Sequence, residues 1–245
     1  MNRFISIGAR IMVRFNLSRA FNSIYGVIYL LIGIVMPLLI SVLLLSSFKS
    51  LVEYPVGTSI LGQTIPAIIP LTATIGGMGV TYLFSTDRSN GVYEYLIATG
   101  KIKIRDIFLS FSIVTMVLIS IILGIDVTTL MVLVHFMAPT VAGTMLELIG
   151  VFSVPVAYVS SLISILAMLT WVSMSKTYSG VNAPGGIGSI IGIIPPLVFL
   201  LVIVRIMRPT DIILIAGLFS AALLMVFIVL LVVVVRRMSN ERMLT

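Results

Sequence analysis

The chain has 245 residues, of which 60% are hydrophobic and 9% charged, and its mean hydropathy is +1.26. A soluble domain cannot cover so much apolar surface, so the composition indicates an integral membrane protein with no room for a soluble catalytic domain. The lack of cysteine and the single histidine exclude disulfides, thiolate nucleophiles and multi-histidine metal sites. The net charge of +7 is distributed as membrane topology requires, and we expect no nucleic-acid partner.

The first 22 residues have the pattern of a helix that lies on the membrane surface. Their apolar residues recur at helical spacing, and three arginines share another face. The apolar set is Phe4, Gly8, Ile11 and Phe15, and the basic set is Arg3, Arg10 and Arg14. Residues 1–22 are therefore predicted to form an amphipathic helix at the cytoplasmic interface, among lipid head groups. The alternative is a basic tail that only sets orientation. The first apolar run is too long for a signal peptide, so we expect none.

Residues 23–245 are predicted to form an all-α domain of six transmembrane helices. Each apolar segment has the roughly 20 residues that a bilayer crossing needs. The predicted spans are 24–47, 64–84, 107–125, 148–174, 186–207 and 212–235. With both termini in the cytoplasm, twelve of the 15 Lys and Arg residues lie inside and three outside. This asymmetry is what the positive-inside rule expects.

The stretch from Val127 to Leu146 is apolar enough to be a seventh span. A crossing there would invert every later segment and place Arg236 and Arg237 outside, against the positive-inside rule. We therefore expect this stretch to extend the third and fourth spans, or to form a re-entrant turn, on the outer side of the membrane.

A charged island, residues 86–106, separates the second and third spans and holds seven acidic and basic side chains. A simple connection needs fewer residues. Ser89 and Asn90 are typical of a helix start, and Thr99-Gly100 is typical of a helix end. The island is therefore predicted to contain a short helix, Asn90 to Thr99, that lies on the membrane surface and is available to a partner.

No segment has the pattern of an active site, so the chain is predicted not to be an enzyme. Residues 57–64 have the spacing of a phosphate-binding loop, but Gln63 stands where a lysine would contact the phosphates. We interpret them as an outer loop that leads into the second span. His135 alone is typical of a polar residue at an interface or a wet cavity, with a proton relay as the lesser alternative. Asp126 and Glu147 are expected at the outer membrane boundary.

Two spans are rich in proline, which interrupts a helix, and in glycine, which has no side chain. The second contains Pro66, Pro70, Gly76, Gly77 and Gly79, and the fifth contains Gly186, Gly188, Gly192, Pro195 and Pro196. Small residues four apart let helices approach closely. Prolines free backbone carbonyls and introduce kinks. The pattern favours a moving, partly wet pathway over ordinary tight packing.

A motif in the charged island resembles one in the permease (transmembrane) subunits of type-2 ATP-binding-cassette (ABC) exporters. Those permeases carry a run of the form acid-basic-x-x-Gly-Thr-x-Glu-Leu-Leu-x-x-Thr-Pro, followed by basic residues. Here the run is Asp87-Arg88-Ser89-Asn90-Gly91-Val92-Tyr93-Glu94-Tyr95-Leu96-Ile97-Ala98-Thr99-Gly100, followed by Lys101, Lys103 and Arg105. It departs from the pattern at Val92, Tyr95 and Gly100. The short connection between the last two spans fits a minimal permease of a prokaryotic plasma membrane.

This resemblance implies that residues 90–99 are a coupling helix that docks into a separate ATPase subunit, which would bind ATP and Mg. This chain would bind no cofactor. The implied docking residues are Asp87, Arg88, Asn90, Gly91, Val92, Glu94, Tyr95, Leu96 and Thr99, with Glu94 as the anchor. A second inner contact would involve Ser175, Lys176 and Ser179.

The resemblance also implies a second permease copy, identical or related, with spans two and five facing each other across the dimer axis. The implied pathway and dimer-interface residues are Pro70, Gly76, Gly77, Gly79, Gly188, Gly192, Pro195 and Pro196. A hydrophobic or amphipathic cargo, such as a lipid, peptide or drug-like molecule, suits the apolar pathway. The alternatives are an ion-driven carrier or channel, which needs buried acids or bases in the membrane, and a membrane enzyme of lipid metabolism, which needs clustered Asp or His.

The six-span topology can be tested with single cysteines, because the chain has none of its own. We predict that an impermeant thiol reagent added outside labels cysteines introduced at Ser50, Thr140 and Thr210. Cysteines at Asn90 and Asn182 should stay unlabelled. External labelling at position 182 would mean that residues 127–146 cross the membrane.

Overall fold

The computed structural model describes residues 6–47, 55–100, 102–174, 183–203 and 209–237, and every element in these ranges is a helix. The long helices are α1 (Ile7–Asn22), α2 (Ile24–Ser47), α3 (Pro55–Ser89), α5 (Ile104–Met137), α7 (Val154–Met174), α8 (Ala183–Ile203) and α9 (Pro209–Arg237). The short elements are α4 (Val92–Ala98), the 3₁₀ turn η2 (Pro139–Val141), α6 (Ala142–Leu148) and the π-helical turn η3 (Ile149–Ser153). The predicted all-α class is confirmed.

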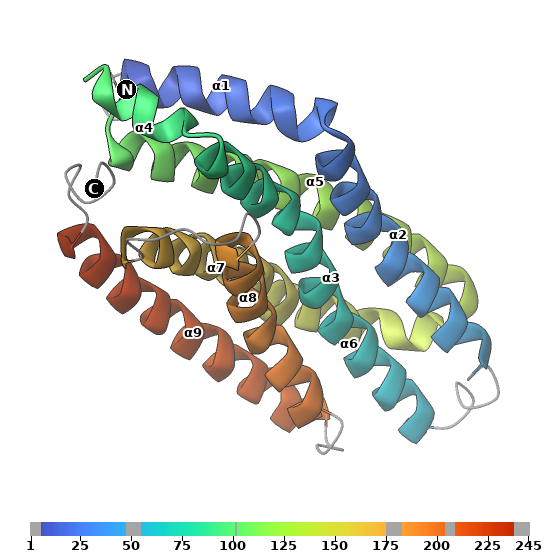
Figure 1. Cartoon of the computed structure of the whole chain (residues 1–245). Coiled ribbons are helices and arrows are strands. Elements are labelled where there is room, and N and C mark those ends of the chain that lie inside the picture. The colour runs from blue at the N-terminus through green and yellow to red at the C-terminus, as the bar shows by residue number, and fades with distance from the viewer. Residues whose placement is uncertain (1–5, 48–54, 101, 175–182, 204–208, 238–245) are drawn as a thin grey trace.

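The long helices run side by side, with α3 at the centre of the bundle (Figure 1). Helix α3 packs against α2, α5, α7 and α8, while α9 lies at the margin against α7. The start of α1, the short α4 and the end of α9 all lie at one end of the bundle (Figure 1). This arrangement places the charged island at the end that the sequence predicts to be cytoplasmic.

Five helical segments of the described chain are long and apolar enough to cross a membrane. They are Ile24–Ser47, Leu61–Phe84, Ile104–Met137, Pro139–Thr170 and Asp211–Val234. The described apolar part of α8, Ile190–Val202, is shorter. The chain therefore has the character of a membrane protein, while the fifth predicted span, residues 186–207, stays a prediction. Helices α2 and α9 expose many large apolar side chains, as lipid-facing helices do.

The N-terminal segment is helical as predicted, but it packs through a face that the sequence pattern did not identify. Helix α1 buries Ala9, Met12, Asn16 and Ala20 against the protein, and its main neighbour is α5. Its apolar side chains at Ile7, Ile11 and Phe15 point away from the bundle. The helix therefore has a protein-facing stripe of two alanines, one methionine and one asparagine, beside the apolar stripe that we predict to lie in the membrane interface.

The ambiguous stretch from Val127 to Leu146 extends two helices. Helix α5 continues without a break to Met137, the chain turns at Ala138, and η2 and α6 lead into α7. Residues 57–64 were interpreted as a loop, and this was wrong, because they form the first turns of α3. The short surface helix begins at Val92 instead of Asn90, because α3 continues as far as Ser89.

The glycines of the second and fifth predicted spans bring helices of this chain together. A Cβ atom added to Gly76 would lie 3.0 Å from the Gly33 Cα of α2, and one added to Gly192 would lie 2.7 Å from the Ser164 Cβ of α7. Gly188 likewise approaches the Ser164 carbonyl, and Gly79 approaches α2 at Gly26 and Tyr29. These contacts give the glycines a packing role within one chain. The dimer interface stays a prediction.

Because α8 and α7 pack this closely, we predict that Gly192→Val destabilises the protein by about 1–3 kcal/mol. The added side chain has no room against the α7 backbone and Ser164. The matched control is Gly124→Val, since a Cβ at this exposed helical glycine meets nothing within 4 Å. Thermal unfolding in detergent, followed by circular dichroism, measures both. Equal shifts for the two variants would contradict the close packing.

Candidate docking site

The charged island folds into a turn, a short helix and a second turn. Gly91 and Gly100 adopt φ angles of +69° and +71°, the left-handed conformation that glycine reaches without a steric penalty. Gly91 lets the chain leave α3 and begin α4, and Gly100 lets it leave α4 and enter α5. Thr99 ends α4, and its hydroxyl donates to the Leu96 carbonyl at 2.6 Å. The two glycines therefore set the position of α4 between two long helices.

Asp87, near the end of α3, joins three helices. One carboxylate oxygen accepts the guanidinium of Arg19 from α1, and the other accepts the Tyr93 hydroxyl of α4 at 2.8 Å. The Asp87 side chain is only 3% exposed, and that of Arg19 is 31% exposed. Charge-assisted hydrogen bonds are about twice as strong as neutral ones, and burial removes competition from water. Asp87 was predicted to contact a partner, but its carboxylate points into the protein and bonds to Arg19 and Tyr93.

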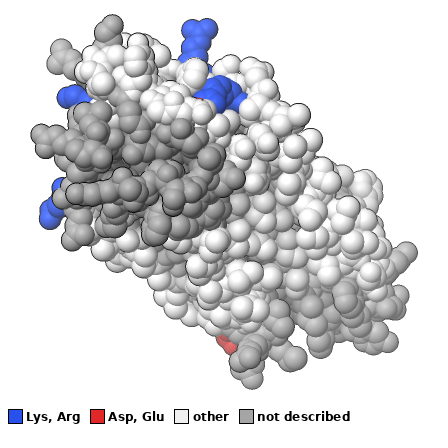
Figure 2. All heavy atoms as spheres, viewed as in Figure 1, with Lys and Arg blue, Asp and Glu red and all other residues white. Residues whose placement is uncertain are grey.

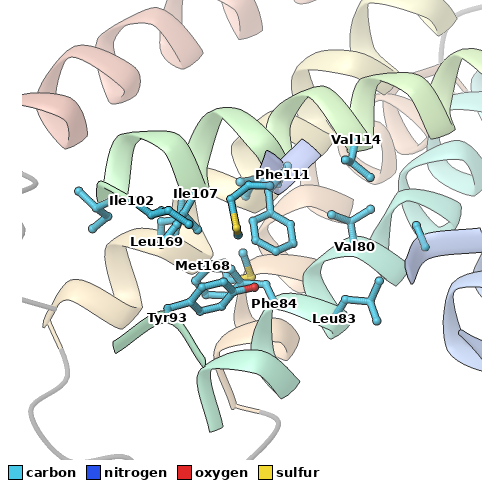
Figure 3. Close-up of a cluster of buried hydrophobic side chains, with 14 of the residues drawn as sticks. Val80, Leu83, Phe84, Tyr93, Ile102, Ile107, Phe111, Val114, Met168 and Leu169 are labelled. Atoms are coloured by element: carbon cyan, nitrogen blue, oxygen red, sulfur yellow. The ribbon is translucent and has the colours of Figure 1, made fainter. Parts of the chain in front are cut away.

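The Tyr93 ring fixes α4 from its buried side. It stacks on Phe84 of α3 with centroids 5.0 Å apart, and both rings meet the edge of Phe111 of α5. Figure 3 shows these rings with Met168 and Leu169 of α7 beside them. Burying one aromatic side chain contributes several kcal/mol, and edge contacts add about 0.5–1.5 kcal/mol. Helix α4 is therefore attached firmly to the ends of α3 and α5.

A second carboxylate, Asp106, links α1 and α5 at the same end of the bundle. It accepts the Ser6 hydroxyl at 2.6 Å and the Lys103 backbone N–H at 3.0 Å. Ser6 is the N-cap of α1 and Lys103 is the N-cap of α5, so one side chain joins two helix starts. Farther along, the Asn16 amide donates to the Ser110 hydroxyl at 2.8 Å. Helix α1 is thus bonded to α5 through polar groups.

Several described side chains at and beside α4 are exposed. Tyr95 is 72% exposed, Asn90 and Thr99 are exposed, and Val92 and Leu96 are half-buried. Of the predicted apolar patch of Val92, Tyr95 and Leu96, Tyr95 is therefore the most exposed member, and the contact of this patch with a partner stays a prediction. The structure does not describe the side chains of Arg88 and Glu94. Ser175, Lys176 and Ser179 lie outside the described residues.

Exposed basic side chains gather at the end of the bundle that carries α4. In Figure 2 blue side chains lie at this end, and a red acidic side chain shows at the opposite end. The described exposed basic residues are Arg10, Arg14, Lys103, Arg105 and Arg236. A surface of this sign attracts anionic lipid head groups or acidic partner side chains.

Sequence reasoning missed three residues that hold this site together: Arg19, Tyr93 and Asp106. One signal was present for Arg19, which departs from the face shared by the other N-terminal arginines. Tyr93 stands between two positions expected to contact a partner, and nothing in the local pattern shows that it points inward. Its pairing with Asp87 depends on the turn at Gly91.

We predict that Arg19→Met lowers the free energy of unfolding by roughly 2–3 kcal/mol. Removing one partner of a buried pair costs about 3–5 kcal/mol, and the partial exposure of Arg19 reduces this. The double variant Arg19→Met/Asp87→Asn should regain part of the loss, because no carboxylate is then buried unpaired. Arg14→Met, at an exposed arginine of the same helix, should change stability by less than about 0.5 kcal/mol. Strictly additive effects of Arg19→Met and Asp87→Asn would show that the two side chains do not interact.

Comparisons with models of protein families, with curated proteins and with solved structures find no match for this chain. The resemblance of the charged island to type-2 permeases therefore stays a prediction.

Proposed function

We propose that the chain is the permease subunit of an ABC exporter and uses ATP hydrolysed, with Mg, by a separate subunit. The observation that carries the proposal is α4, a short helix held rigidly at the end of the bundle with Tyr95 exposed. A loop that only connects α3 to α5 needs no buried ion pair and no aromatic core. A helix that receives force from a partner needs both, because a loose attachment would absorb the movement.

The attachments of α4 lead directly to the long helices. Tyr93 bonds to Asp87 and stacks on Phe84, both in α3, and packs on Phe111 of α5. Helix α3 has 35 residues, which is about 52 Å at 1.5 Å per residue. Movement of α4 would therefore pass along α3 to the far side of the membrane. In the proposed cycle the cassette subunit closes on ATP, pushes α4 and rocks two permease copies between inward and outward states.

The proposal places the chain in a prokaryotic plasma membrane, with both termini in the cytoplasm and a second permease copy as partner. The bundle end that carries α4 would then face the cytoplasm, in agreement with its basic side chains. The cargo would be hydrophobic or amphipathic, since the described membrane-length helices bury few charges. The chain itself would perform no chemical step.

An ion-driven carrier is the second candidate function, and one observation favours it. This class needs an acid or base buried within the membrane. Asp126 of α5 is fully buried in the protein, and its expected position at the outer membrane boundary stays a prediction. Glu147 is exposed, and its expected position at the same boundary stays a prediction.

The docking role of α4 can be tested at Tyr95. We predict that Tyr95→Ser lowers retention of the cassette ATPase by at least about tenfold, because exposed tyrosines often dominate the binding energy of an interface. The matched control is Phe136→Ser, at the other end of α5, where the ring is 80% exposed. Quantitative co-purification from the native membrane measures both variants. Equal retention by both would mean that α4 is not the docking helix.

The energy source can be tested separately. We predict that the purified chain alone hydrolyses no ATP above background, and that activity is recovered when the co-purified cassette subunit is added back. Residues 57–64 have the spacing of a phosphate-binding loop, but they are helical and Gln63 is buried in α3. This segment therefore does not form the loop that phosphate binding needs. ATP hydrolysis by the isolated chain would refute the proposal that a separate subunit hydrolyses the ATP.

A further inference from the structure

Asp126 is a buried carboxyl group for which the packing of the bundle supplies no partner. It lies in α5, its relative exposure is 0%, and neither carboxylate oxygen has a hydrogen-bond partner in the part of the chain that the structure describes. The other buried carboxylates behave differently, because Asp87 and Asp106 are fully engaged. Asp126 lies 20 residues beyond Asp106, about 30 Å along the helix.

The surroundings of Asp126 are apolar. Leu123 and Leu130, one turn to either side on the same face of α5, belong to a buried cluster formed with α3, α7 and η3. The same cluster includes Ile65 and Ile69 of α3, Ile149 of η3 and Ala157 of α7. An ionised carboxylate without a partner in such a setting costs far more than a folded protein can offset. The group is therefore accommodated there as the neutral acid.

The charged and titratable groups on the neighbouring elements do not face Asp126. Most lie at the other end of α5, toward Asp106. Nearer to Asp126, Tyr158 of α7 is paired with Ser120 at 2.6 Å, and His135 and Glu147 are exposed. The described groups at the far end are Arg10, Arg14 and Arg19 of α1, Tyr25 and Tyr29 of α2, Tyr82 and Asp87 of α3, and Lys103, Arg105 and Asp106 at the start of α5. No described cation neutralises Asp126.

Helix α3, which packs against α5, has an irregular backbone. Pro70 has no N–H, so the Pro66 carbonyl of α3 loses its helical donor. The Ser153 hydroxyl, in the π-helical turn η3, donates to this carbonyl at 2.7 Å. Ser220 of α9 donates to the Val151 carbonyl of the same turn at 2.9 Å. Proline-broken helices and π-turns are where membrane helices bend and where functional sites concentrate.

We propose that Asp126 is a proton-binding site, which holds a proton while α3, α5 and α7 are packed together and releases it to water when they separate. The carboxyl O–H bond breaks, the proton passes to water and the carboxylate is then hydrated; repacking reverses the step. A metal cation would need several oxygen ligands, and no described group completes such a shell around Asp126. The site does not depend on an ATPase partner, so it stands or falls separately from the docking role of α4.

The test uses the full chain in lipid nanodiscs and the apolar reagent dicyclohexylcarbodiimide, which reacts with a carboxyl group in its acid form. The carboxyl proton moves to a carbodiimide nitrogen, the carboxyl oxygen attacks the central carbon, and the adduct rearranges to a stable N-acylurea. Mass spectrometry of peptides measures the labelling rate at Asp126. Glu147 and Asp211, which are exposed, serve as internal controls. Asp126→Asn, which has nearly the same shape as the neutral acid, identifies the adduct and should unfold at the wild-type temperature.

We expect Asp126 to be labelled at neutral pH at least about tenfold faster than Glu147 and Asp211, because ordinary carboxyl groups are almost fully ionised there. The rate should fall reversibly along a one-proton curve as the pH is raised. Absence of labelling at Asp126, or a rate that stays constant up to about pH 10, would overturn the proposal. Suppression of labelling by sodium chloride but not by choline chloride at fixed pH would also overturn it, and would assign the site to sodium. The wild-type titration gives its answer even if every variant at this position fails to fold.

Discussion

The buried Asp87 carboxylate is the interaction on which the proposed docking end of the bundle depends. It belongs to α3 and contacts α1, through Arg19, and α4, through Tyr93. A buried carboxylate is stable only when both oxygens are satisfied, so α1 and α4 must both be in place. The Tyr93 ring extends the same constraint to α5 through Phe111. The surface helix therefore cannot shift without disturbing three longer helices.

Close packing carries this constraint into the membrane-length part of the chain. Hydrophobic burial does little to hold helices together in lipid, so backbone approach and van der Waals contact replace it. Gly76 meets Gly33 of α2, and Gly192 meets Ser164 of α7, on opposite flanks of the central helices. Helices that approach each other this closely have few other ways to pack. A packed core of this kind changes by discrete steps and transmits displacement instead of absorbing it.

Two carboxylates show how position decides chemical role. Asp87 is buried beside a guanidinium and a phenol, and it serves as a fixed structural joint. Asp126 is buried in α5, between two leucines of an aliphatic cluster and on a helix that packs against the proline-containing α3, and it has no described partner. The first environment keeps a charge in one place. The second disfavours a charge in the packed state and admits it only on opening, which is the requirement for proton exchange.

The sequence alone determined the membrane character, the all-helical class, most helix positions and the presence of a short helix in the charged island. These follow from apolar runs of bilayer length and from local start and stop residues such as Gly100, which act over a few residues. Only the tertiary structure decided which way side chains point: Asp87 and Tyr93 turn inward, Tyr95 turns outward, and Asp126 is covered. These orientations depend on contacts between residues far apart in the chain, such as Arg19 with Asp87, which no local pattern encodes.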